Sequence, residues 1–145
     1  MFTAKKILTG FTAAALIGGA SAAYAEVDSV SITAKDQALS ENAVLADRVV
    51  AEEDGWLVLY TVKNDGNGFA TVDQKIGHTH INGGVNENVL VTPTKDLESG
   101  ERVVLMLHTD ATGDVPNEFE NMTDTSKDGP FLVDGYVTML VVKVK

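Results

Sequence analysis

The fold is decided by the stretch GWLVLYTV at residues 55–62. This stretch is almost continuously apolar, as expected of a strand that other parts of the protein cover on both sides. We therefore predict a central strand here. The strand ends at residues 63–68, KNDGNG, because these are turn residues that tolerate positive φ.

Further short β-rich runs lie on both sides of this strand, separated by Gly, Asn, Asp and Pro. No part of the chain after residue 25 keeps a helical periodicity for three turns. The other predicted strands cover residues 30–34, 44–51, 69–76, 88–92, 102–109 and 136–144. Seven or eight strands at these spacings predict an all-β fold. We expect an antiparallel β-sandwich of immunoglobulin-like or cupredoxin-like type, with a small barrel as the alternative.

Residues 1–25 have the three-part order of a cleavable signal peptide. Lys5 and Lys6 precede an apolar run, and Ala23 and Ala25 are the small residues at the cut. The apolar run is shorter than the roughly 20 residues that a membrane-spanning helix needs. We therefore expect a single domain at residues 26–145, released into the periplasm or outside the cell, with no membrane insertion after signal cleavage.

Composition limits the chemistry of this domain. The chain has no cysteine, so disulfides, thiol redox reactions and a blue-copper site are excluded. Its net charge is −10, and removal of Lys5 and Lys6 with the signal takes it to −12. Such a charge repels phosphate backbones and anionic membranes. The expected partner is an unknown protein or a small ligand, and not a nucleic acid.

Four short motifs occur in an order that resembles a known family. They are GWLVLY at 55–60, IG at 76–77 with GVNENV at 84–89, MLHTD at 106–110, and DGP at 128–130. Together they resemble an uncharacterised exported β-domain, a domain of unknown function common in haloarchaeal surface proteins and present in some bacteria. The resemblance implies a β-sandwich displayed outside the cell, without an established activity. The matched positions of interest are His108, Asp110, Asp128 and Gly129, whereas the family usually lacks histidines at positions 78 and 80.

Three histidines form the first candidate site. His78 and His80 share one face if they lie on a strand, and so do Met106 and His108. Three imidazoles suit zinc, and an added thioether suits copper. The alternative is that His78 and His80 lie on a solvated loop near the glycines at 77, 83 and 84, and that His108 simply ends a strand.

The long connection at 110–130 is the second candidate. It carries the oxygen ligands that calcium prefers, although their spacing does not fit an EF-hand. These residues are Asp110, Asp114, Asn117, Glu118, Glu120, Asp124 and Asp128. A solvated acidic loop has the same composition. We expect residues 128–130 to form a turn in which Gly129 takes positive φ.

Catalysis is the third possibility, with His108 and Asp110 as an acid–base pair on one strand face. The chain has no nucleophile elbow, phosphate loop or His-Glu-x-x-His motif. Trp56 and Tyr60 share a strand face and could stack on sugar, but a strand tryptophan is ordinarily core. The leading hypothesis is an exported non-enzymatic binding or structural module. The alternatives are a periplasmic metal-binding protein and an exported enzyme.

Overall fold

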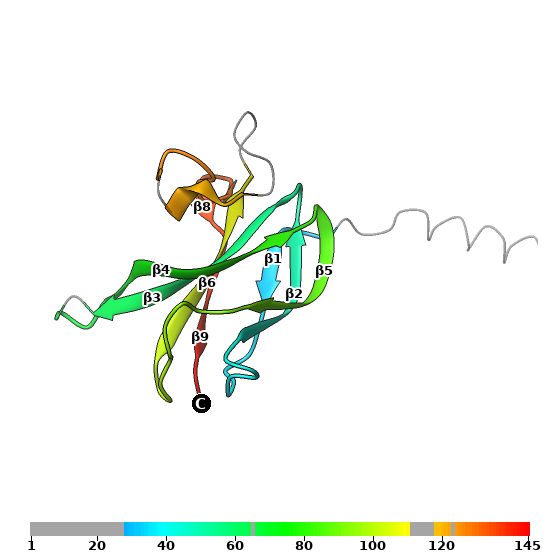
Figure 1. The fold of residues 1–145 in the computed structure, drawn as a ribbon. Coiled ribbons are helices and arrows are strands. Elements are labelled where there is room, and N and C mark those ends of the chain that lie inside the picture. Colours follow the sequence, from blue (N-terminus) through cyan, green and yellow to red (C-terminus); the bar gives the residue numbers. More distant parts are fainter. Residues whose placement is uncertain (1–27, 65, 111–117, 123) are drawn as a thin grey trace, which may run out of the picture.

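Two stacked antiparallel sheets make up the computed structural model, which describes residues 28–64, 66–110, 118–122 and 124–145 (Figure 1). The three-stranded sheet has the order β1-β2-β5, and its strands are β1 (Ser31–Thr33), β2 (Val44–Ala51) and β5 (Gly84–Val91). The four-stranded sheet has the order β4-β3-β6-β9. Its strands are β4 (Ala70–Ile81), β3 (Gly55–Asn64), β6 (Arg102–Thr109) and β9 (Met139–Lys143).

The remaining elements are small and lie between β6 and β9. A 3-10 turn, η2 (Glu120–Met122), is followed by a two-stranded hairpin of β7 (Leu132–Val133) and β8 (Tyr136–Val137). Figure 1 shows these elements at one end of the four-stranded sheet. The predicted signal peptide at residues 1–25 lies outside the described residues.

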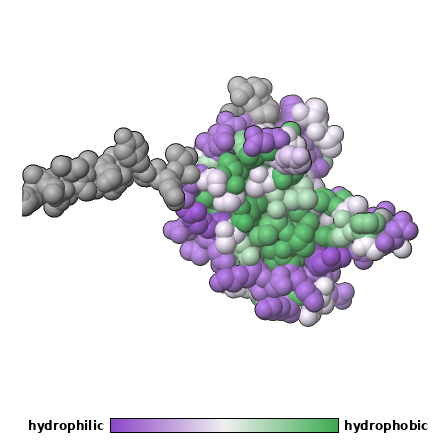
Figure 2. Space-filling model, turned by 180° about the vertical axis from the view of Figure 1, so that it is seen from behind, coloured by the Kyte–Doolittle hydropathy of each residue, from purple (hydrophilic) through white to green (hydrophobic). Residues whose placement is uncertain are grey.

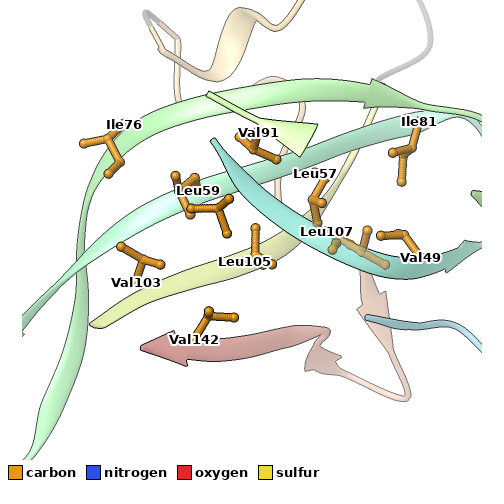
Figure 3. Close-up of a cluster of buried hydrophobic side chains, with 12 residues drawn as sticks. Val49, Leu57, Leu59, Ile76, Ile81, Val91, Val103, Leu105, Leu107 and Val142 are labelled. Carbon is orange, nitrogen blue, oxygen red and sulfur yellow. The ribbon is translucent and has the colours of Figure 1, made fainter. Parts of the chain in front are cut away.

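The main core lies between the two sheets (Figure 3). Side chains alternate along each strand, so Leu57 and Leu59 of β3 point inward together with Leu105 of β6. They meet β2 and β5, which contribute Val49 and Val91. These five side chains are all fully buried. Apolar packing between two layers therefore holds the fold.

Strand β4 passes very close to the chain that follows β5. A Cβ atom at Gly77 would lie 2.6 Å from the carbonyl oxygen of Thr92, so only glycine fits there. The pairing of β4 with β3 shifts register between Leu59 and Tyr60, which marks a β-bulge on β4 at Ile76, next to Gly77. Strand β4 continues past this bulge to Ile81, well beyond its predicted end at residue 76.

The predicted all-β antiparallel sandwich is confirmed. The described residues form nine strands, because the predicted strand 136–144 is split into β8 and β9 and because the short strand β7 was not predicted. The two sheets are separate, which decides against the small barrel. Within the described part of the chain, no helix has the length and apolar character needed to cross a membrane.

Candidate functional site

The side of the four-stranded sheet that faces away from the core carries most of the predicted site residues. We call it the outer face. Because paired residues in antiparallel strands point to the same side, the register places one row across it, His80–Trp56–His108, and next to it His78–Val58–Met106. His78 and His80 thus lie on strand β4 and not on a loop.

His108 is the centre of a buried hydrogen-bond chain. Its Nε2 lies 2.8 Å from the hydroxyl of Tyr60, and its Nδ1 lies 2.5 Å from the backbone carbonyl oxygen of Asp128. A carbonyl can only accept, so Nδ1 carries the proton and Nε2 accepts from Tyr60. His108 and Tyr60 are only 2% and 7% exposed, so their partners within the protein replace water.

Burial shifts the acid–base behaviour of this group. Desolvation lowers the pKa of His108 more than the carbonyl of Asp128 raises it, so the imidazole is neutral at physiological pH. Desolvation also raises the pKa of Tyr60 to about 12, so its hydroxyl keeps the proton. Both shifts favour the neutral forms that the Tyr60–His108 hydrogen bond requires.

Asp128 is held in place by the segment around η2. Its carboxylate accepts a hydrogen bond of 2.8 Å from the backbone N–H of Glu120, and the side chain is fully buried. The Asn121 amide donates to the carbonyl oxygens of Thr125 and Lys127, which ties the same segment together. In the predicted turn the positive φ, 44°, belongs to Asp128 and not to Gly129, so that detail of the prediction is wrong.

Aromatic rings fill the end of the outer face that carries Trp56 and His108. The ring of Trp56 contacts His78 and His80 edge-on, with centroids 5.6 and 5.2 Å apart. Phe119 packs against Trp56, His78 and His108. His78 is exposed as a residue, but its ring is partly buried by these neighbours, which lowers its pKa. Phe119 therefore covers Trp56, His78 and His108.

The three histidines do not converge on one point. Strand β3 separates β4 from β6, which puts the backbones of His80 and His108 about 10 Å apart, with Trp56 between them. Both ring nitrogens of His108 already have hydrogen-bond partners. Met106 and His108 do share the outer face, as predicted. Among the described residues, no group of three or more His, Asp or Glu side chains is placed to hold a metal ion.

The predicted acid–base pair of His108 and Asp110 does not form. His108 bonds to Tyr60 and Asp128, and the buried Oδ1 of Asp110 has no hydrogen-bond partner among the residues that the structure describes. Two of the candidate calcium ligands, Asp114 and Asn117, lie outside the described residues. Glu118 and Asp124 are exposed, whereas Glu120 makes an ion pair of 2.9 Å with Lys127.

The part of the outer face away from the Trp56 row is apolar and exposed to solvent. Val62, Val72, Val104 and Met106 form a continuous layer with the aromatic residues. Strand β9 adds Met139 and Val141, whose register with Met106 and Val104 points them to the same side. They are 52% and 53% exposed. The end of the β3–β4 hairpin, residues 61–64 and 70–74, projects from the sheets in Figure 1, and we call it the β3–β4 arm. Seen from behind in Figure 2, a broad hydrophobic area occupies the middle of the molecule and extends toward this arm.

Sequence reasoning missed two members of the site, Tyr60 as the partner of His108 and Phe119 as the cover. Tyr60 lies on the central strand, where the sequence pattern predicts an ordinary core residue. Phe119 gave one signal, as one of few apolar residues in a long acidic connection. Their roles depend on contacts between residues 48 and 11 positions apart, which no local pattern contains.

A family model described as a domain of unknown function, DUF7282, matches residues 30–145. No curated protein and no solved structure matches the chain. The matched range contains all nine strands of the described fold and the Tyr60–His108–Asp128 chain. The resemblance to a family without an assigned function is thereby confirmed, and this chain belongs to the DUF7282 family.

Proposed function

We propose that this domain is a non-enzymatic binding module that docks a partner protein on the outer face of its four-stranded sheet. The observation that carries the proposal is the pair Met139 and Val141, two large apolar side chains that are half exposed beside a continuous apolar layer. In a two-sheet protein, the side of a sheet that faces water is ordinarily polar. An exposed apolar patch instead marks an interaction site.

The shape of the face favours a macromolecule over a small molecule. Between the β3–β4 arm and β9 there is an apolar hollow of only about 70 Å³, lined by residues such as Val62, Val104 and Val141. Pockets for small ligands hold roughly 300–1,000 Å³. A surface that is apolar but nearly flat suits the side chains of another protein.

A second cavity, of about 440 Å³, lies under the arm and is polar. Its charged groups are largely satisfied within the protein. Lys95 lies 3.4 Å from Glu101, and Arg102 donates to the side-chain oxygen of Asn64 at 3.1 Å. Nothing in this arrangement selects a ligand, so we keep the outer face as the proposed site.

We further propose that the module acts in the periplasm or outside the cell. The support is the three-part pattern of residues 1–25 and the excess of acidic residues. Mass spectrometry of the chain recovered from its source cells tests this proposal. An N-terminus at Glu26 is expected, and an intact N-terminus would contradict it.

Site-specific photo-crosslinking in the source cells tests the docking face. A benzoylphenylalanine residue replaces Val141 in one variant and Leu90, on the exposed side of β5, in the control. The two positions are matched, since Leu90 is 48% exposed. We expect an adduct of one defined mass from position 141 and none from position 90. Equal adducts, no adduct, or an adduct of twice the mass of the chain would contradict a partner protein on this face.

A further inference from the structure

We propose that the partner docked on the outer face presents acidic side chains around an apolar centre. This inference rests on the proposed function and adds the chemistry of the partner. Its basis is the distribution of charge on the outer face, which is opposite in sign to that of the whole protein.

The register identifies the paired strand residues that point to the outer face. On β4 the position opposite Tyr60 is Lys75, and its ammonium group lies 5.8 Å from the centroid of the Tyr60 ring. On β6 and β9 the opposed pair Arg102 and Lys143 continues the alternation of Val104 and Val141. Among the residues that the register pairs on the outer side of these four described strands, the charged ones are these three, and none is acidic.

The basic character of the paired residues on the outer face is opposite to the acidic composition of the chain. The chain has 21 acidic and 11 basic side chains, so a random selection of charged residues would be mainly acidic. The acidic residues of the arm lie elsewhere. Asp73, for example, lies at the second register shift between β3 and β4, where it is paired with no residue of β3, and it lines the polar cavity that Arg102 also borders. The outer face is therefore a basic and apolar patch on an acidic protein.

Lys75 and Lys143 are also available to a partner, and Arg102 donates to a neutral side chain, that of Asn64, so its charge has no acidic counterpart among the described residues. The ion pairs within the described parts of the chain are Arg48–Asp28, Lys95–Glu101 and Lys127–Glu120. None of them involves Lys75, Arg102 or Lys143. Cations that border an apolar patch without an internal counter-ion give electrostatic complementarity to an acidic surface.

Two other occupants fit less well. A second copy meeting this face symmetrically would bring its own Lys75, Arg102 and Lys143 against the same cations. An anionic membrane attracts clusters of about four to eight basic residues, whereas this face has three and the chain carries a net charge of −10. An acidic protein segment fits both the sign and the number of charges.

Charge reversal combined with the crosslinker at position 141 tests the inference. Lys75→Glu/Lys143→Glu changes the outer face, and the control Lys35→Glu/Lys63→Glu makes the same change in net charge at exposed lysines outside the outer face. The double reversal turns two attractive charge pairs with the acidic partner into repulsive ones, which should reduce the adduct yield roughly tenfold. The adduct yield of the control should stay within about twofold of that of the parent. Unfolding midpoints equal to that of the parent show that both variants fold.

The outcomes separate the two proposals. An adduct that survives Lys75→Glu/Lys143→Glu unchanged would leave the docking face standing and overturn the acidic partner. The absence of any adduct at position 141 in the parent chain would remove both. Sedimentation with phosphatidylglycerol vesicles that is abolished by the same reversal would assign the anionic surface to lipid and overturn a protein partner.

Discussion

Replacing Tyr60 by Phe tests the buried hydrogen bond at the centre of the site. The ring stays and keeps its packing, so the change removes only the hydroxyl that donates to Nε2 of His108 at 2.8 Å. His108 is 2% exposed, so water cannot replace the lost donor. A buried acceptor left without a partner costs about 1–3 kcal/mol of unfolding free energy. For a domain of this size that is a decrease of about 1 M in the urea midpoint.

Urea unfolding followed by tryptophan fluorescence measures this change. The chain has one tryptophan, Trp56, whose row on the sheet includes His108. The control is Tyr136→Phe, because Tyr136 is 78% exposed and its loss should alter stability by less than about 0.5 kcal/mol. The slope with denaturant should be the same in both variants. If the two variants unfold at the same midpoint, the hydrogen bond does not contribute as the structure indicates.

Three further results are expected. Burial lowers the pKa values of His78 and His108 in the folded state, so the unfolded chain takes up protons first as the pH falls. The free energy of unfolding should therefore be at its full value above pH 6.5, the ordinary pKa of histidine, and should decrease below it. A urea midpoint that is higher at pH 5.5 than at pH 8 would contradict these shifts. Leu105→Ala should cost about 2–5 kcal/mol in the same assay, whereas Val141→Ala, on the exposed side of β9, should cost less than about 1 kcal/mol. Because the histidines do not converge, zinc or copper should leave the melting temperature unchanged; an increase that disappears in His78→Ala/His80→Ala would instead establish a two-histidine site.

Strands whose neighbours in sequence decide their structure were predictable. The runs at 44–51 and 102–109 coincide with β2 and β6, because each alternates or is strongly apolar and is bounded by turn residues. The two faces of 139–143 were also predictable. Met139 and Val141 are exposed and Val142 is buried, as the period of two requires. These features depend only on residues a few positions apart.

The site itself was not predictable to the same degree. The glycines at 77, 83 and 84 made a loop around His78 and His80 plausible, but Gly77 is needed for a close contact with Thr92, which only the packed structure reveals. Whether three histidines meet depends on which strand lies between them. That order, with β3 between β4 and β6, is a property of the whole sheet. The sequence therefore predicted the candidate ligands and placed them correctly on one face. It could not predict the distance between the histidines of β4 and the histidine of β6.

An uncovered apolar sheet face makes the colloidal stability of the domain depend on its charge. At neutral pH the net charge of the domain at residues 26–145, −12 without Lys5 and Lys6, keeps copies apart. This repulsion weakens as the pH falls toward the isoelectric point, which is near 4.5 for the full sequence. Salt acts in the same direction, since the Debye length falls from about 10 Å at 0.1 M to about 3 Å at 1 M. Crowded solutions of the isolated domain should thus become turbid on acidification or salting well before the sandwich unfolds.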